Sequence, residues 1–224
     1  MKSSGATQEP MPTADVAAVG SPPWWDEAVA YLVGCDPVLR ELANRLPGER
    51  LVPRDDPFIA LARAIVGQQL SVKAARTIWR RLEEAAGEVT PARLSRMRAA
   101  TLARCGLSAR KAEYLRDLAV HFRTGAIEPA RWPSLDDEAL IAELVAVRGI
   151  GRWTAEMFLM FNLMRPDVLP LDDVGLLAAI GRHYNGGIRV TREQAAEIGG
   201  RWRPWRTAAS WYLWRSLDPP PMEE

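Results

Sequence analysis

The sequence predicts an all-α fold, and two patterns in a chain of ordinary domain size support that prediction. The chain has 224 residues, enough for one or two domains with a sizeable apolar core. No stretch of about five residues alternates apolar and polar side chains, so we expect no sheet. Residues that start or stop helices recur at short intervals and divide the chain into roughly eleven helices with short connections.

Local signals place each helix of the first half. Asp36-Pro37 separates the first two helices, and Asp55-Asp56-Pro57 opens the third, because proline is tolerated in the first helical turn. Ser71 and Ser108 are the expected N-caps of two longer helices, and a glycine follows each of these helices. The expected ranges are 24–33, 36–46, 55–66, 71–86, a short helix from 90, 99–104 and 108–123.

The second half contains a glycine-rich turn between two helices. Arg148-Gly149-Ile150-Gly151 forms this turn, and the next loop ends where Asp172 or Asp173 begins a helix. Thr191 is the expected N-cap of the following helix, and Pro204 separates that helix from the last one. The expected ranges are 134–147, 152–163, 172–184, a helix from 191, and a last helix that ends near 217.

Both ends of the chain are expected to lie outside the folded core. Residues 1–22 are rich in Pro, Ser, Gly, Ala and Thr, which predicts a disordered tail, and 218–224 is expected to be flexible. The core is then one unit over 23–217. No apolar run approaches eighteen residues and no apolar signal segment is seen, so we expect no membrane partner and a cytoplasmic protein.

Composition excludes several classes of protein. The chain has 29 basic and 28 acidic residues, a net charge of +1, which excludes a polycation but permits a local basic face. Two cysteines cannot form a four-cysteine iron–sulfur or zinc site, and with two histidines a His-rich catalytic metal site is not expected. Nine tryptophans predict either large buried rings or stacking surfaces.

The turn at Gly149-Ile150-Gly151 has the features of an anion site. Its glycines permit positive φ angles and close approach of another chain, and the following helix points free N–H groups outward. Arg152 adds a positive charge, so a duplex phosphate suits the position. A plain turn between two helices is the alternative interpretation.

Asp172 and Asp173 stand at a helix start, where carboxylates serve as N-caps. The same position holds a carboxylate in a fairly dry cleft, where it can stabilise a developing positive charge or orient a water molecule. Both interpretations fit these two residues alone.

Four motifs in order resemble the 3-methyladenine DNA glycosylase II family of the helix-hairpin-helix DNA glycosylase superfamily. They are Ala64-Ile65-Val66-Gly67-Gln68-Gln69-Leu70-Ser71-Val72, Gly149-Ile150-Gly151-Arg152-Trp153-Thr154-Ala155, Asp172-Asp173-Val174-Gly175-Leu176 and Trp202-Arg203-Pro204-Trp205-Arg206. The resemblance covers 25–217. It implies a two-lobed helical bundle with a cleft between interleaved lobes, in a compact form without the N-terminal β domain of some members.

The resemblance implies that Asp173 is catalytic and that Asp172 is the adjacent cap. The implied reaction is hydrolysis of the N-glycosidic bond of an alkylated purine that has been flipped out of duplex DNA. Bifunctional relatives carry a Schiff-base lysine where this chain has Trp153. Tryptophan cannot form an imine, so no AP lyase activity is expected.

The resemblance also assigns the remaining site residues. It places Trp153, Trp214 and Met157 at the base pocket, where indole faces attract a cationic methylated purine. It makes Gln69 and Leu70 the wedge that fills the gap left by the flipped base. A phosphate would contact Gly149, Gly151, Arg152 and Thr154, and a Na⁺ or K⁺ ion would bind the backbone carbonyls of Val145, Val147 and Ile150. No other cofactor is expected. Arg148 stands where the family has proline.

The expected partner is double-stranded DNA with a damaged base, bound by a monomer that scans the nucleoid. Basic residues gather in 63–81, 93–116 and 201–217, around these motifs. Two alternatives stay open, namely a non-catalytic helix-hairpin-helix DNA-binding protein and a glycosylase for deaminated or oxidised bases. The lesion itself stays open among 3-methyladenine, 7-methylguanine, 1-methyladenine, hypoxanthine and ethenoadenine.

Overall fold

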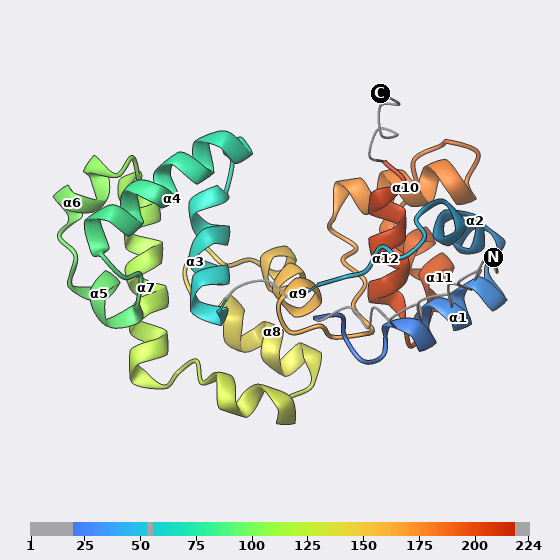
Figure 1. Ribbon diagram of the computed structural model, residues 1–224, viewed down its shortest axis with the longest axis horizontal. Coiled ribbons are helices and arrows are strands. Elements are labelled where there is room, and N and C mark those ends of the chain that lie inside the picture. Colours follow the sequence, from blue (N-terminus) through green and yellow to red (C-terminus); the bar gives the residue numbers. More distant parts are fainter. Residues whose placement is uncertain (1–19, 53–55, 218–224) are drawn as a thin grey trace, which may run out of the picture.

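The computed structural model of the protein describes residues 20–52 and 56–217. Within these residues all regular secondary structure is helical, which confirms the all-α prediction (Figure 1). The helices are α1 (Trp25–Cys35), α2 (Pro37–Arg45), α3 (Pro57–Gly67), α4 (Val72–Ala86), α5 (Pro91–Arg96), α6 (Ala99–Arg104), α7 (Ala109–Thr124), the 3-10 helix η1 (Pro129–Ser134), α8 (Asp137–Val145), α9 (Arg152–Phe161), α10 (Val174–Tyr184), α11 (Arg192–Gly200) and α12 (Arg206–Arg215).

The predicted N-caps at Asp56, Ser71, Ser108 and Thr191 are confirmed, since each side chain accepts a hydrogen bond from the first turn of its helix. The helix η1 was not predicted. Its sequence holds two prolines, which remove N–H donors, and it is anchored by the buried Trp132 rather than by a helical pattern. The predicted tails 1–22 and 218–224 lie outside the described residues, apart from 20–22.

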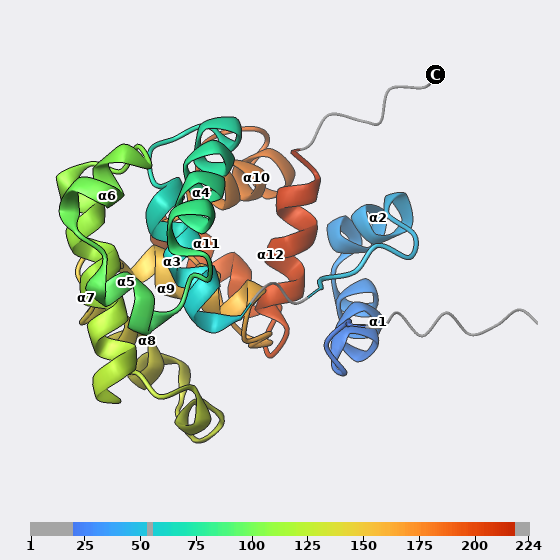
Figure 2. The same ribbon diagram turned by 60° about the vertical axis from the view of Figure 1, so that its left-hand side comes forward.

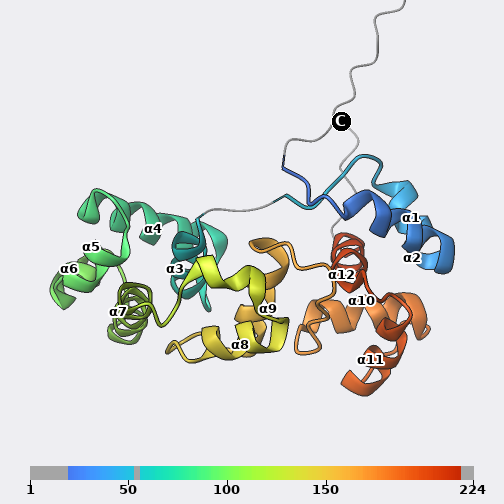
Figure 3. The same ribbon diagram turned by 90° about the horizontal axis from the view of Figure 1, so that it is seen from below.

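The described residues form two hydrophobic cores, and the helices form two corresponding groups in Figure 1. The first is built by α3 to α9, and the second combines α1 and α2 with α10, α11 and α12. The two ends of the folded chain therefore share one core. Figures 2 and 3 show the ribbons of α1 and α2 on the side of α12 from other directions. Phe161 and Trp214 pack against both cores, with ring centroids 5.7 Å apart, so they mark the junction.

Asp36 joins the N-terminal helices to the C-terminal ones. Its residue is 1% exposed, and its Oδ1 accepts hydrogen bonds from the first-turn N–H groups of α2. Its Oδ2 accepts from the Tyr184 hydroxyl and from the Trp202 Nε1–H, each at 3.0 Å. This carboxylate therefore fixes α2 against the part of the second core that carries α10.

No helix among the described residues is long and apolar enough to cross a membrane.

Candidate active site

Asp173 is held by three N–H donors from three helices. It is the N-cap of α10, and its Oδ1 accepts from the Leu176 backbone N–H at 2.6 Å and from the Trp214 Nε1–H at 2.8 Å. Its Oδ2 accepts from the Trp153 Nε1–H at 2.8 Å. Two indoles from α9 and α12 thus fix the orientation of one carboxylate at the junction of the two cores.

Gly175, which follows Val174, lies close to the Asp173 carboxylate and the Trp214 ring. A Cβ at Gly175 would lie 3.2 Å from the Asp173 Oδ1 and 3.6 Å from the Trp214 ring. A larger residue would press on the carboxylate and on its indole donor. The hydrophobic-Gly-hydrophobic run noted in the sequence therefore leaves room for Asp173 and Trp214.

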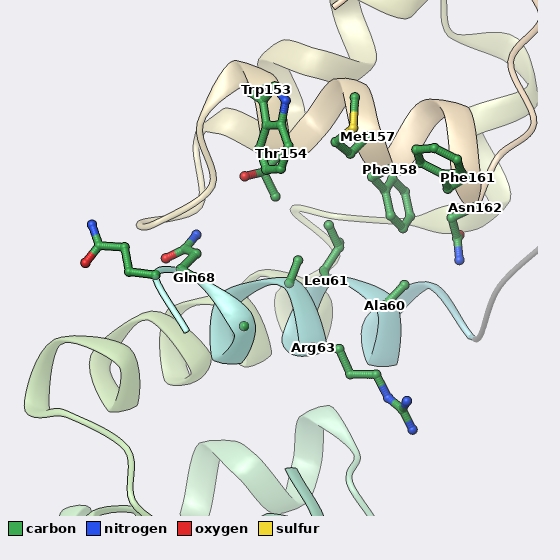
Figure 4. Close-up of a pocket in the computed structure, with 13 residues that line it drawn as sticks. Ala60, Leu61, Arg63, Gln68, Trp153, Thr154, Met157, Phe158, Phe161 and Asn162 are labelled. Atoms are coloured by element: carbon green, nitrogen blue, oxygen red, sulfur yellow. The ribbon is translucent and has the colours of Figure 1, made fainter. Parts of the chain in front are cut away.

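A cavity of about 570 Å³ lies between α3 and α9, beside this carboxylate. The α9 side is lined by Trp153, Met157, Phe158 and Phe161, and Trp153 and Gln68 lie at the end opposite Asn162 (Figure 4). Trp153 and Met157, two of the residues expected at a base pocket, both line this cavity, and Trp214, the third, contacts Asp173 without lining it.

The sequence interpretation missed the α3 wall of the cavity. Ala60, Ala64 and Gly67 line it from α3, and their spacing of four and three residues puts them on one helix face. A run of small residues at helical spacing was the available signal. Leu61 and Arg63 also line the cavity from α3.

The turn after α3 presents Gln69 and Leu70 to solvent. Gln69 adopts a left-handed φ of 58°, which is uncommon for a residue with a side chain, and the Leu70 side chain is 39% exposed. Gln68 points back instead, and its Nε2–H donates to the Gly149 carbonyl at 2.7 Å. The turn therefore touches the glycine-rich hairpin and projects its next two residues outward.

The hairpin glycines have different structural roles. Gly149 has a φ of 86°, and a Cβ there would overlap the Tyr114 ring, so no larger residue fits. Gly151 is the N-cap of α9, it has no side-chain cap, and a Cβ there would meet nothing within 4 Å. The exposed space at Gly151 leaves the N-terminus of α9 open to an anion, while Thr154 is buried in its first turn.

The two arginines of the hairpin are held by acidic side chains. Arg152 donates to the Glu138 oxygens at 2.9 and 2.5 Å and to the Glu156 Oε1 at 2.9 Å, and these bonds raise its pKa further above the ordinary value. Arg148 pairs with Glu113. Its backbone N–H donates to the Asp117 Oδ2 at 2.8 Å, a bond that a proline in this position could not make.

Glu156 is a buried acidic residue in α9, the helix that follows the hairpin. It is 5% exposed, and burial raises the pKa of its carboxyl, an effect that Arg152 opposes in part. Its second carboxylate oxygen has no hydrogen-bond partner. The expectation that Asp172 is the helix cap is wrong, because Asp173 caps α10, and Asp172 instead forms an ion pair of 2.6 Å with Arg192. The negative charge of Asp172 also contributes to raising the pKa of Glu156.

The residues expected to hold a monovalent ion lie in the turn between α8 and α9. The Val147 carbonyl already accepts the Ile150 N–H at 3.1 Å, while Val145 is 42% exposed at the end of α8. In the described part of the chain, no group of three or more His, Cys, Asp or Glu side chains could hold a metal ion.

Comparison with known proteins places this geometry in a family. The model of the HhH-GPD superfamily base excision DNA repair protein matches residues 62–204. A DNA-3-methyladenine glycosylase of Bacillus subtilis is 30% identical over 81% of this chain. The chain spans 64% of that protein's length and 62% of another Bacillus subtilis relative.

Two solved structures are similar over most of the chain. The crystal structure of a DNA-3-methyladenine glycosidase from Bacillus halodurans is 35% identical, with a TM-score of 0.77, over 84% of this chain and 88% of that one. A Schizosaccharomyces pombe 3-methyladenine DNA glycosylase, solved in complex with abasic DNA, is 32% identical, with a TM-score of 0.75, over 85% and 96%. The chain belongs to the HhH-GPD superfamily of base excision DNA repair proteins.

Proposed function

We propose that this protein is a monofunctional DNA glycosylase that removes alkylated purines from double-stranded DNA. The observation that carries the proposal is Asp173, oriented by Trp153 and Trp214 beside an aromatic cavity. The similar Bacillus and Schizosaccharomyces proteins are named for 3-methyladenine, a base of this class.

Asp173 stabilises the positive charge that develops on the sugar. As the bond between C1′ and the base nitrogen breaks, its electron pair leaves with the base, and a water oxygen bonds to C1′. The water loses its proton to Asp173 or to solvent. An alkylated purine already carries positive charge, so it leaves without a strong general acid.

Aromatic faces select the base. Trp153 is 44% exposed and lines the cavity with Met157 and Phe158, so a flipped purine can stack there. A cationic methylated purine gains cation–π attraction that a normal purine lacks. This difference supports a preference for alkylated bases.

Gln69 and Leu70 fill the gap in the duplex, since both project from the turn after α3. The backbone N–H groups at Gly149, Gly151 and Thr154 bind the phosphate, and Arg152 contributes after it exchanges Glu138 for that phosphate. A Na⁺ or K⁺ ion at the carbonyls of Val145, Val147 and Ile150 would draw the hairpin toward the DNA. The chain acts as a monomer, because one copy supplies the carboxylate and the cavity.

The experiment is base release from methylated duplex DNA, read by chromatography, with trapping by borohydride in parallel. We expect release of methylated purines and no trapped covalent complex. Strand cleavage with efficient trapping would indicate a lyase and contradict the proposal. DNA binding without any base release would favour a non-catalytic binding protein, and release of oxidised or deaminated bases alone would change the substrate class.

A further inference from the structure

One face of α7 contacts both loops that we assign to DNA. Lys111, Tyr114 and Asp117 follow one another at intervals of three residues, which places them along one side of the helix. Lys111 reaches the turn after α3, and the other two reach the hairpin before α9. No motif in the sequence interpretation used any of these three residues.

Lys111 closes the end of α3. Its Nζ donates to the Val66 carbonyl at 2.8 Å and to the Gln68 carbonyl at 2.7 Å. A cation at a helix C-terminus satisfies carbonyls that the helix leaves without partners. Desolvation lowers the pKa of this half-buried ammonium group, and its two carbonyl acceptors hold it toward the turn. Gln69, which directly follows Gln68 in the sequence, has the left-handed φ of 58°.

The hairpin is held from the same helix. The Tyr114 ring lies against Gly149, and the Asp117 Oδ2 accepts the Arg148 N–H at 2.8 Å. Gln68 then joins the two loops directly, because its Nε2–H donates to the Gly149 carbonyl at 2.7 Å. The helix α7, the turn after α3 and the hairpin before α9 therefore each contact the other two.

We propose that Lys111 is a positioning residue that holds the turn bearing Gln69 and Leu70 at a fixed place relative to the hairpin. It contacts neither the base nor the DNA and acts through Gln68. A phosphate bound at the hairpin then sets where Gln69 enters the duplex. This inference rests on the proposed function, because it assigns the turn to base flipping.

The test compares two DNA substrates. One carries a methylated purine opposite a normal base, and the other carries it opposite an abasic site, where flipping needs no wedge. In single-turnover assays we expect Lys111→Met to slow release from the paired substrate about tenfold or more, because small misplacements near a reacting centre are costly. Release from the unpaired substrate should stay within about twofold of wild type. Lys111→Arg, which keeps the charge, should restore part of the rate.

A matched control and a second variant complete the test. Arg123→Met removes a positive charge from the same helix at an exposed site that bonds only to Ser95, and it should match wild type on both substrates. Gln68→Leu breaks the contact with Gly149, so it should slow release from the paired substrate as Lys111→Met does and leave release from the unpaired substrate unchanged. This second variant tests the same inference if Lys111→Met folds poorly.

Equal losses on both substrates would overturn the inference, because they would indicate a general structural role. Wild-type rates for Lys111→Met on the paired substrate would overturn it as well. A wild-type protein that releases no methylated base would instead contradict the proposed function. In that case 2-aminopurine fluorescence beside the lesion still compares flipping by Lys111→Met and wild type.

Discussion

The Trp153 Nε1–H donates a 2.8 Å hydrogen bond to the Asp173 Oδ2, although the two residues come from different helices and are 20 positions apart. The same indole lines the cavity between α3 and α9. One side chain therefore touches both the carboxylate and the space where we place the base.

Trp153→Phe separates the two roles of this indole. Phenylalanine keeps an aromatic face and loses the N–H donor, so base release should slow about tenfold, the value of one hydrogen bond to a charged group. Trp153→Ala also loses the stacking face and should slow release further. Single-turnover release from methylated DNA measures both variants. A Trp153→Phe protein as fast as wild type would show that the hydrogen bond is dispensable.

Gly149→Ala should destabilise the hairpin. A side chain at a φ of 86° is strained, and its Cβ would overlap the Tyr114 ring. We expect a loss of about 2–4 kcal/mol in the free energy of unfolding, measured in urea. Gly151→Ala is the matched control, since a Cβ there meets nothing within 4 Å, and its stability should stay close to wild type. Equal stability of the two variants would contradict the packing described.

Asp36→Ala should weaken the contact between the two ends of the chain. It leaves the half-buried Tyr184 hydroxyl and the buried Trp202 indole without their acceptor. Uncompensated buried donors of this kind predict a loss of about 3 kcal/mol or more in the free energy of unfolding. Thermal and urea unfolding measure it. A loss below about 1 kcal/mol would mean that these bonds are replaced elsewhere.

Glu156→Gln should change how stability depends on pH. Burial raises the pKa of Glu156 above its ordinary value of 4.5, so its contribution is fully present below that pH and is lost as pH rises through the folded-state pKa. Wild type should therefore lose stability relative to Glu156→Gln as pH rises from 4.5 toward neutrality. Urea unfolding at several pH values measures the difference.

Glu138→Gln should change the dependence of stability on pH in the opposite direction. Hydrogen bonding to Arg152 lowers the pKa of Glu138, so its contribution is present above its ordinary pKa and is lost on acidification. Wild type should lose stability relative to this variant only as the pH falls below about 4.5. The same slope for both variants would contradict the assignment of burial to Glu156.

Features that depend on neighbouring residues were predictable from the sequence, but contacts between residues far apart in the sequence were not. The N-caps at Ser71 and Ser108 and the turn at Gly149 depend on a few neighbouring residues, so the pattern alone located them. The Lys111 contacts join residues 43 and 45 positions apart, and no local pattern reports such a pairing. The pairing of Arg152 with Glu138 is missed for the same reason, so its charge was assigned to phosphate alone.

Asp173, and not its neighbour Asp172, is the carboxylate that we propose stabilises the reacting sugar. The most direct measurement is the single-turnover rate of base release from methylated duplex DNA by wild type, Asp173→Asn and Asp172→Asn. Asparagine still caps α10, so both variants should fold. We expect the rate for Asp173→Asn to fall at least about 100-fold, while the rate for Asp172→Asn, which loses an exposed ion pair with Arg192, stays within about threefold of wild type. A wild-type rate for Asp173→Asn would contradict the proposed role of the Asp173 carboxylate in base release.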